Sequence, residues 1–344
     1  MRIILASTFV PFVNGGARFI VEWLEEKLLD EGHQVERFYL PFLETPEDLL
    51  DQVSALRLID VSDACDLLIA FRPPAYVLRH PNKVLWFIHH IRSYYDLWDG
   101  EYGPAKTPIN KAVRESLKSL DDVSLREARK VFTNSQVVAD RLLAFNNVQA
   151  EPLYPPIRAP ERFHCRSYGD ELVAVCRMEP HKRQDVLIEA LKHTRTPVKL
   201  RLCGKTSGEG FAGQLKAAAH DPKLKGRLVL DDRWISEDEK AELMAEALAA
   251  VYAPHDEDSY GYPSLEAAHA AKCVVTTTDS GGVLELIQDG RNGLVCAPDA
   301  LSLARAFDRL YMDRALARRL GEANRDRLGE LGIHWERVVS ALTS

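Results

Sequence analysis

The chain has 344 residues, of which 46% are hydrophobic and 28% are charged, a balance that excludes a disordered, collagen-like or coiled-coil protein. At about 150 residues per domain, this length predicts two domains, each large enough to bury its own core. The net charge of −7, from 44 basic and 51 acidic residues, argues against nucleic-acid binding through overall charge.

Apolar runs of strand length alternate with longer helical segments along the chain. In the first half we expect strands at 3–6, 34–38, 67–70, 84–88 and 130–133, and helices at 17–31, 109–120 and 136–145. In the second half we expect strands at 172–176, 199–203, 228–230, 249–252, 274–277 and 293–295, and helices at 184–192, 210–220, 237–246, 263–271, 283–288 and 300–312. Strands that are apolar on both faces and alternate with helices predict two parallel α/β sheets.

Three features bear on the domain boundary and the compartment. Residues 153–160 contain three prolines, which predicts a stiff linker between two α/β halves. No apolar run approaches the ~20 residues of a membrane span, and the N-terminus is expected to be a first strand rather than a signal peptide. None of the six cysteines has C-x-x-C or zinc-finger spacing, so buried, reduced thiols in a cytoplasmic protein are expected.

The loop after the first expected strand ends in Gly15 and Gly16 and leads into a helix. Two glycines let backbone N–H groups approach a phosphate at a helix N-terminus. The G-x-G-x-x-G dinucleotide pattern is absent, so an ordinary strand-to-helix loop is an equally good interpretation.

A basic segment follows the strand expected at 172–176. Arg177 lies just past that strand, and Lys182 lies just before the next helix. Both can neutralise a diphosphate, the arginine as a planar fork and the lysine as a point charge. Judged alone, a solvated basic loop is as good an interpretation.

Residues 254–268 carry the sharpest signal. Acidic residues and Gly261 precede a helix expected to begin near Pro263, because proline is favoured at a first helical position. The N–H groups of this helix start and the Ser264 hydroxyl can bind a phosphate, and Glu266 can bind vicinal hydroxyls such as those of a ribose. Each piece taken singly is ordinary turn chemistry.

Together and in this order, the motifs resemble the family-4 retaining nucleotide-sugar glycosyltransferases, the group 1 glycosyl transferases. The family's G-R-x4-K-G-x-D pattern is matched by Arg177, Lys182 and Asp185, and its E-G-F-G-L-P-x-x-E-A pattern by residues 258–267. Further matches to the family's motifs lie at 14–16, 32–35, 132–135, 203–204, 281–285, 290–293 and 333–336. The resemblance therefore covers essentially the whole chain.

Several positions depart from the family's pattern, and four of them bear on the donor and the acceptor. Asp258 replaces the first glutamate of the E-x7-E pair, Arg183 replaces the glycine after the lysine, and Leu284 replaces the proline before Glu285. Arg233 replaces the glycine before the base-binding turn. These departures concern the donor and the acceptor more than the fold.

The resemblance implies a GT-B fold, in which two Rossmann-like parallel-sheet domains face each other across a cleft. The implied acceptor-side domain covers 1–157, with a C-terminal helix in 329–344 packing back on it, and the nucleotide-sugar-binding domain covers 158–328. The implied activity is retaining, metal-independent, hexosyltransferase-type transfer from a nucleotide sugar to a glycan, lipid-linked or small-molecule acceptor, with no cofactor. The implied location is the cytoplasm or the inner face of the membrane.

The resemblance also implies residue roles. Arg177 and Lys182 would stabilise the leaving diphosphate, and His89 would face the donor sugar, with His90 as an alternative match. The expected catalytic residues are His89, Arg177, Lys182 and Asp258. The expected substrate-binding residues are Gly15, Gly16, Trp234, Ile235, Ser259, Tyr260, Gly261, Tyr262, Ser264, Leu265 and Glu266.

Other interpretations stay open. A non-catalytic sugar-nucleotide-binding protein is supported by Asp258, and an epimerase of the GT-B fold is a second alternative. The acidic run 256–258 resembles a metal-binding D-x-D motif of another fold, a likeness that we interpret as accidental. Residues 105–141 carry a net charge of +3, for which a solvated helix face is favoured over a weak peripheral membrane contact.

Overall fold

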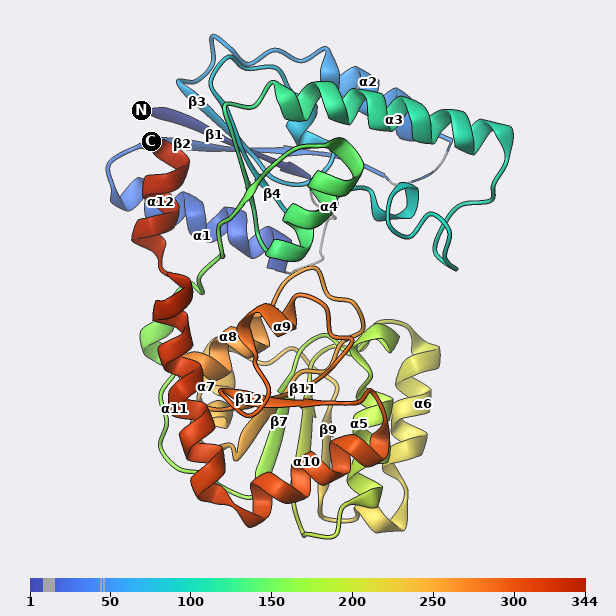
Figure 1. Cartoon of the computed structure of the whole chain (residues 1–344), viewed down its shortest axis with the longest axis vertical. Helices are drawn as coiled ribbons and strands as arrows, with labels where there is room; N and C mark the ends of the chain where they lie inside the picture. The colour runs from blue at the N-terminus through green and yellow to red at the C-terminus, as the bar shows by residue number, and fades with distance from the viewer. Residues whose placement is uncertain (9–15, 44, 46) are drawn as a thin grey trace. The chain divides into compact units, whose positions relative to one another are not determined.

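The structure is a computed structural model that describes residues 1–8, 16–43, 45 and 47–344. It divides into two compact units, one formed by Met1–Pro156 with His334–Ser344 and one formed by Ile157–Ile333. Each unit contains a six-stranded sheet in which every strand pair is parallel. The predicted pair of parallel α/β sheets is therefore confirmed (Figure 1).

The N-terminal unit has the strand order β2-β1-β3-β4-β5-β6. Its strands are β1 (Arg2–Thr8), β2 (Gln34–Leu40), β3 (Leu67–Ala70), β4 (Lys83–Phe87), β5 (Lys130–Thr133) and β6 (Glu151–Pro152). Its helices are α1 (Gly16–Asp30), α2 (Leu49–Arg57), α3 (Pro108–Arg126), α4 (Gln136–Asn146) and α12 (Trp335–Thr343), with 3-10 turns η1 (Ala75–Val77) and η2 (Arg92–Tyr94). The strands β3 and β4 are buried along their whole length, as their continuous apolar runs require.

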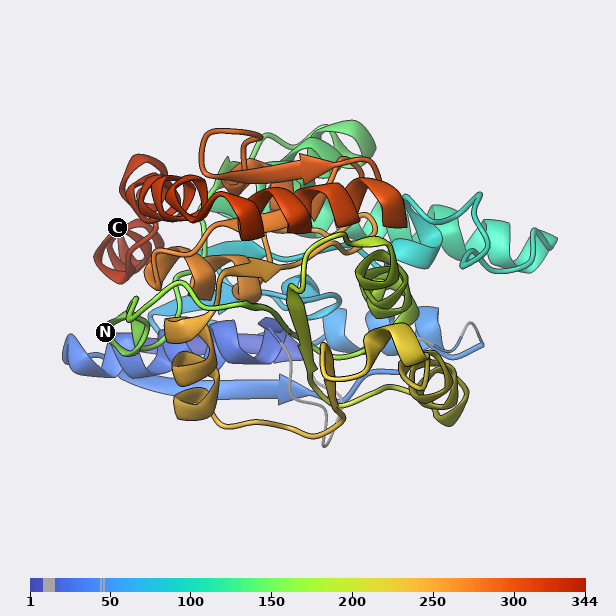
Figure 2. The same cartoon turned by 90° about the horizontal axis from the view of Figure 1, so that it is seen from below.

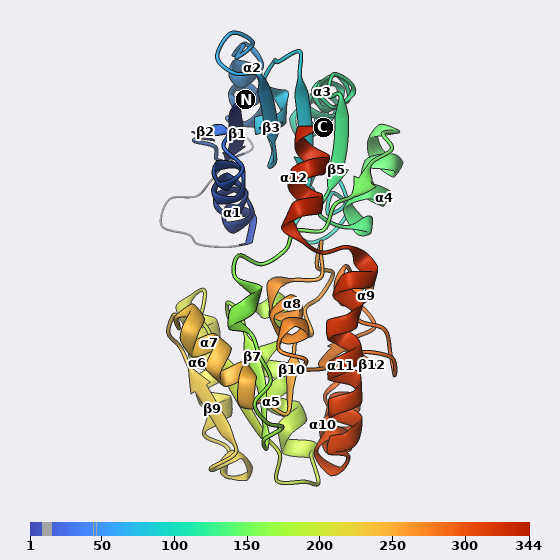
Figure 3. The ribbon, with the colours of Figure 1, turned by 90° about the vertical axis from the view of Figure 1, so that its left-hand side faces the viewer.

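Helices cover both faces of this sheet. On one face, Leu24 of α1 and Val338 and Leu342 of α12 pack against the sheet in a single apolar cluster (Figure 3). On the other face, α2, α3 and α4 contribute residues such as Leu117 and Leu142 to a second cluster. The last helix of the chain therefore completes the core of the first unit.

The C-terminal unit has the strand order β12-β11-β10-β7-β8-β9. Its strands are β7 (Glu171–Val175), β8 (Lys199–Cys203), β9 (Leu228–Asp231), β10 (Ala249–Val251), β11 (Val274–Thr277) and β12 (Gly293–Cys296). Its helices are α5 (Gln184–His193), α6 (Glu209–Ala219), α7 (Glu237–Glu246), α8 (Tyr262–His269), α9 (Val283–Leu286), α10 (Ala300–Met312) and α11 (Arg314–Leu331). The 3-10 turns are η3 (Pro160–Arg162), η4 (Pro180–Lys182) and η5 (Pro222–Leu224).

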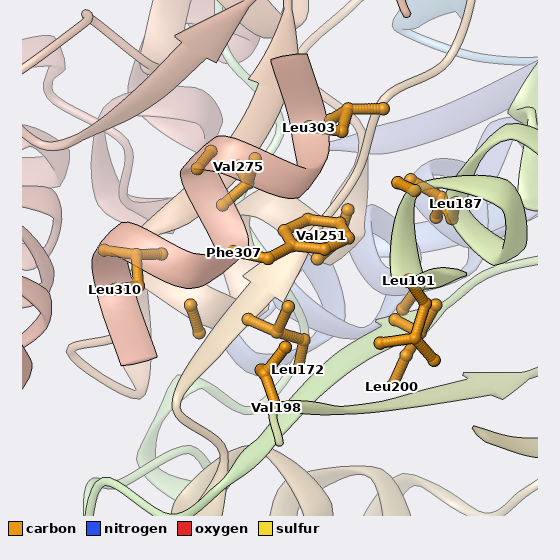
Figure 4. Packing of buried hydrophobic residues seen from close by; sticks show 14 of the residues in the cluster. Leu172, Leu187, Leu191, Val198, Leu200, Val251, Val275, Leu303, Phe307 and Leu310 are labelled. Atoms are coloured by element: carbon orange, nitrogen blue, oxygen red, sulfur yellow. The ribbon is translucent and has the colours of Figure 1, made fainter. Parts of the chain in front are cut away.

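The largest apolar cluster of this unit lies between the sheet and the helices α5 and α10. Helix α10 runs beside β12 (Figure 2), and its fully buried Phe307 lies among Leu172, Leu191 and Val251 in the middle of the cluster (Figure 4). The amphipathic spacing of α10 thus fixes the helix on the sheet.

The strand order of this unit has a reversal between β7 and β10. From β7 the chain passes through α5 to β8 on one side, and from β10 it passes through α8 to β11 on the other side. The loops that leave two such neighbouring strands diverge and open a crevice at the carboxyl edge of the sheet. This reversal is where a ligand site is expected.

Two helices were not predicted, namely α2 and α11. Helix α11 is rich in charge, and it buries only a narrow stripe that includes Leu316, Leu320 and Asn324. Its docking depends on tertiary contacts, since the Asn324 side chain donates to the Lys272 carbonyl at 2.9 Å. Sequence periodicity does not register such a contact.

Two further findings concern the membrane and the thiols. Within the residues that the structure describes, no helix combines the length and the apolar character that crossing a membrane requires. All six cysteines are free thiols, but only Cys65, Cys203 and Cys273 are buried. Cys176 and Cys296 are half-buried and Cys165 is exposed, which corrects the expectation of buried thiols.

Truncation of the fully buried Phe307 to alanine should lower the free energy of unfolding by about 3–5 kcal/mol, because it leaves a cavity in the main core of the C-terminal unit. Urea unfolding followed by circular dichroism measures this loss. The matched control is Met312→Ala on the same helix, where the side chain is 73% exposed and the expected change is within about 0.5 kcal/mol. Equal losses in the two variants would contradict the placement of α10.

Candidate functional site

The loop that follows β7 is the first of two segments at the strand reversal. It contains Arg177 and the short turn η4, and it ends where Gln184 begins α5. The buried Gln184 side chain donates to the Arg177 carbonyl at 3.1 Å and accepts from the Glu179 N–H at 3.3 Å. One side chain thus holds the shape of the basic loop.

Lys182 connects this loop to the segment after β10. Its Nζ donates to the Tyr252 hydroxyl at 2.8 Å and forms an ion pair with Glu257. The lysine side chain is only 9% exposed. Burial tends to raise the pKa of Glu257, but Lys182 outweighs burial and holds the pKa below its usual value.

Arg177 has a different environment from Lys182. Its side chain is exposed, and its guanidinium forms an ion pair with Glu179 at 2.8 Å within the same loop. Lys182 is therefore a nearly buried cation fixed by neighbours, whereas Arg177 is a cation available at the surface of the crevice.

Arg183 departs from the family's glycine, and the structure gives the reason for that glycine. The residue has φ 58° and ψ 36°, a left-handed conformation that glycine adopts without strain. In this chain the Arg183 guanidinium binds Asp279 at 2.8 Å and holds the pKa of that carboxyl far below its usual value. This ion pair offsets the conformational cost and ties the β7 loop to the loop after β11.

The segment after β10 passes close to other backbone at two glycines. Gly261 has φ +68°, and a Cβ there would lie 2.3 Å from a ring carbon of Tyr252. Gly281 has φ +61°, and a Cβ there would lie 2.4 Å from the Glu257 carbonyl oxygen. Both glycines are required for the loops to pack this closely.

The start of α8 places two buried polar groups at the site. Ser264 Oγ is buried without a hydrogen-bond partner. Glu266 is buried as well: its Oε1 accepts from Lys240 of α7 at 2.8 Å, and its Oε2 has no partner. Burial raises the pKa of Glu266 to about 7 despite the opposing effect of Lys240. Buried polar atoms without partners are rare in folded proteins and are typical of ligand sites.

The remaining predicted positions of this segment differ in exposure. Asp258, Ser259 and Tyr262 are half-buried, whereas Tyr260 and Leu265 are buried in the core. The last two side chains therefore pack in the protein interior.

The turn between β9 and α7 presents one side chain outward and one inward. Trp234 is 54% exposed, and Ile235 is buried in a cluster with Val175 and Cys203. Arg233, which departs from the family's glycine, binds Asp231 at 3.0 Å and Glu239 at 3.0 Å. These two ion pairs fix the turn from both sides.

The other predicted site residues belong to the N-terminal unit. Gly15 lies outside the described residues, and Gly16 is the exposed first residue of α1. His89 follows β4, and its Nδ1 donates to the His90 carbonyl at 2.6 Å. Since a carbonyl only accepts, the neutral His89 ring carries its lone pair on Nε2.

His90 is the weaker of the two candidate histidines. It is buried, stacked on Tyr95 with ring centroids 4.1 Å apart, and hydrogen-bonded to Asn146 at 2.8 Å. Burial lowers its pKa to about 4. This environment is that of a core histidine and favours His89 as the functional candidate.

Two of the basic side chains at 105–141 pack on an aromatic ring rather than form a free charged face. Lys106 Nζ lies 3.6 Å from the Trp98 ring centroid, and the Arg114 guanidinium lies 4.7 Å from it. Cation–π contacts of this kind stabilise the loop before α3.

Sequence reasoning missed four residues that build the site: Gln184, Lys240, Tyr252 and Glu257. Lys240, Tyr252 and Glu257 act through partners far away in the sequence; Lys182 and Glu257, for example, are 75 residues apart. Gln184 instead holds its own loop. The signal for Glu257 was the acidic run 256–258, in which we considered a metal-binding motif. Among the residues described, no group of three or more metal-ligating side chains is found.

Comparisons with known proteins agree with this architecture. The model of the family "Glycosyl transferases group 1" matches residues 167–327. Human alpha-1,3/1,6-mannosyltransferase ALG2 is 23% identical over 292 residues, which cover 77% of this chain and 68% of that protein. Glycogen synthase of Mycobacterium tuberculosis is 32% identical over 178 residues, which cover 50% of this chain and 41% of that protein.

Solved structures share the fold over nearly the whole chain. Sucrose-phosphate synthase from Thermosynechococcus elongatus has a TM-score of 0.75 at 17% identity, covering 99% of this chain and 97% of that chain. Anabaena HepE, solved with UDP and glucose, has a TM-score of 0.74 at 17% identity, covering 100% of this chain and 99% of that chain. The predicted GT-B fold class is confirmed by these likenesses.

Substitution of Gly281 by alanine should cost more than about 2 kcal/mol of folding free energy, because the new Cβ meets the Glu257 carbonyl and also forces a left-handed alanine. Thermal unfolding measures the loss. Gly290→Ala is the matched control, since Gly290 has φ +68° but open space around it, so only the left-handed cost of about 1 kcal/mol is expected. A Gly281→Ala variant as stable as Gly290→Ala would show that the two loops do not pack as described.

Proposed function

Because this chain belongs, through its C-terminal unit, to the group 1 glycosyl transferases, we propose that it is a retaining, metal-independent glycosyltransferase. It moves a hexose from a nucleotide sugar to a glycan, a lipid-linked molecule or a small-molecule acceptor. Two relatives support this proposal by their names, a mannosyltransferase and a glycogen synthase. HepE, which shares the fold, has been solved with UDP-glucose.

One observation carries the proposal. The strand reversal of the C-terminal unit brings the cationic loop after β7 to the loop after β10, and Lys182 makes the contact between them. The second loop leads directly into α8, where Ser264 and Glu266 have buried polar atoms without partners. An anion beside a pair of hydroxyls, as in a nucleoside diphosphate, matches these groups in charge and in hydrogen bonding.

In the proposed reaction, the bond between the sugar's anomeric carbon and the diphosphate oxygen breaks, and the acceptor oxygen bonds to that carbon on the same face. The acceptor hydroxyl's proton passes to the departing diphosphate oxygen. Negative charge grows on the leaving diphosphate. Arg177 and Lys182 stabilise that charge, with help from the N–H group of Ser264. Fixed cations do so without the reorganisation that water would need.

The remaining groups hold the two ends of the donor. Glu266 accepts hydrogen bonds from the ribose hydroxyls, and the exposed Trp234 borders the base. Asp258 and the backbone around Ser259 orient the sugar.

A non-catalytic sugar-nucleotide-binding protein is the second candidate, because Asp258 is one methylene shorter than the family's glutamate. A thermal-shift screen over UDP-, GDP-, ADP- and dTDP-sugars identifies the donor. Hydrolysis or transfer of that donor by the purified protein, followed by chromatography of the released nucleotide, then separates an enzyme from a binder. A transferase releases the nucleotide and a binder does not.

Replacement of Arg177 by alanine should lower turnover about a hundredfold, because a charge-assisted contact to a developing anion contributes ~3 kcal/mol to the transition state. Lys182→Ala should lower it at least as much, and its melting temperature must be measured too because Glu257 loses its buried partner. The control is Lys199→Ala, an exposed cation at the opposite end of the sheet. Activity should also persist in EDTA. Turnover within threefold of wild type in both variants would contradict the assigned roles.

Substitutions of the two acidic residues Glu266 and Asp258 should differ in their effects on binding of the free nucleotide and of the intact donor. Glu266→Gln should weaken the binding of free nucleotide and of intact donor alike, because the ribose is common to both ligands. Asp258→Asn should leave binding of the free nucleotide unchanged and weaken only binding of the donor, because we propose that this residue faces the sugar. Isothermal titration of each variant with both ligands measures the difference. Equal losses for the two ligands in Asp258→Asn would place that residue away from the sugar.

A further inference from the structure

The three cations around the β7 loop each have a carboxylate partner within the protein. Arg177 pairs with Glu179, Arg183 pairs with Asp279, and Lys182 pairs with Glu257. The first partner belongs to the same exposed loop as its cation, and the second fixes a backbone turn. The third pair joins the loop after β7 to the loop after β10, at the edge of the sheet where the diphosphate is proposed to bind.

Glu257 takes the place on Lys182 that a ligand anion would take. Its Oε2 accepts from both Lys182 Nζ and the Tyr252 hydroxyl. The glutamate side chain is 23% exposed and the lysine side chain is 9% exposed, so little water shares the contact. A nearly buried ammonium group with an anion already on it has limited capacity to bind a second anion.

The backbone of Glu257 has little freedom to withdraw. Its carbonyl accepts from the Gly282 N–H at 2.8 Å, and the residue pairs with Gly281 as an isolated parallel bridge. Only the side chain can move away from Lys182, or remain there and take up a proton.

We propose that Glu257 is a built-in competitor of the donor diphosphate: its carboxylate occupies Lys182 in the ligand-free protein and must be displaced or protonated when the diphosphate binds. This inference rests on the proposed function of Lys182. Glu257 is thus a positioning residue that acts through Lys182 and sets how donor affinity depends on pH.

The sign of the dependence follows from the charges. In the free protein Lys182 keeps the pKa of Glu257 low, and in the complex the neighbouring phosphate raises it, so binding is accompanied by proton uptake. Donor affinity therefore rises as the pH falls. At high pH Glu257 stays ionised, and the repulsion between its carboxylate and the donor diphosphate is fully present. The other titratable and charged groups near Glu257 are Lys182, Tyr252, His181, Cys176, Arg177 and Glu179. All of them remain in a Glu257→Gln variant, so a difference in affinity between the two proteins traces to the Glu257 charge and to its effect on these neighbours.

The test is isothermal titration of wild type, Glu257→Gln and Glu171→Gln with UDP-glucose, GDP-mannose and ADP-glucose between pH 5.5 and 8.5. Glutamine keeps hydrogen-bonding capacity toward Lys182 and Tyr252 but removes the charge. Glu171 is the matched control because it is also 23% exposed and ion-paired, to Arg201 at 2.8 Å, at the opposite end of β7.

We expect Glu257→Gln to bind the donor about tenfold more tightly than wild type at pH 8.5, with the ratio falling toward one at pH 5.5. Titration in PIPES and in bis-Tris, which differ in ionisation enthalpy, should show proton uptake by wild type and less by the variant. Glu171→Gln should match wild type throughout. If only Glu257→Gln bound the donor, the Glu257 carboxylate would be shown to prevent binding in the wild type, which would support the inference.

Two results would overturn the inference while leaving the proposed function in place. One is weaker donor binding by Glu257→Gln, and the other is a ratio of donor affinities between this variant and wild type that stays constant with pH. Absence of binding of all three nucleotide sugars to every variant would remove the proposed function and the inference together. Circular dichroism of each variant at pH 7 confirms that the compared proteins are folded.

Discussion

The parallel pairing of β7 with β10 is the constraint on which the rest of the C-terminal unit depends. Its register, with Leu172 opposite Ala249, brings the carboxyl ends of both strands to one edge of the sheet. Because α5 and α8 then leave toward opposite sides, the two loops must share the space between them. The close approaches at Gly261 and Gly281 and the contact from Lys182 to Tyr252 are consequences of that shared space.

Two buried glutamate–lysine pairs near this space shift the pKa of their carboxyl groups in opposite directions. Glu266 lies so deep that burial outweighs Lys240, and its pKa rises to about 7. Glu257 lies nearer the solvent, and there Lys182 outweighs burial and lowers the pKa. The same two residue types therefore produce a carboxyl with a pKa near neutrality in one place and a carboxylate with a pKa below its usual value in the other, because the balance of desolvation and ion pairing differs.

The sequence predicts elements well where one chemical feature dominates. The bounds of β3 and β11 were predicted correctly, because β3 is an apolar run that begins after Asp66 and β11 is a run of β-branched residues. Helix α11 was missed because its sequence is dominated by charge and its docking depends on Asn324. At the site, motif positions could be read from the loops at strand ends, but the partner of Lys182 could not, since Glu257 meets it only after the sheet has formed. The left-handed conformation of Arg183 was likewise hidden, because the residue type gives no sign of it.

The crossing of α12 from the end of the C-terminal unit back to the first sheet has a consequence for biosynthesis. On the ribosome, Val338 and Leu342 are made only after every residue of the C-terminal unit, yet they cover the same face of the sheet as α1. The N-terminal unit is thus completed only after the C-terminal unit has been made, against the usual order in which N-terminal domains finish first. Until α12 is made, the part of the first sheet's apolar face that Val338 and Leu342 cover stays exposed.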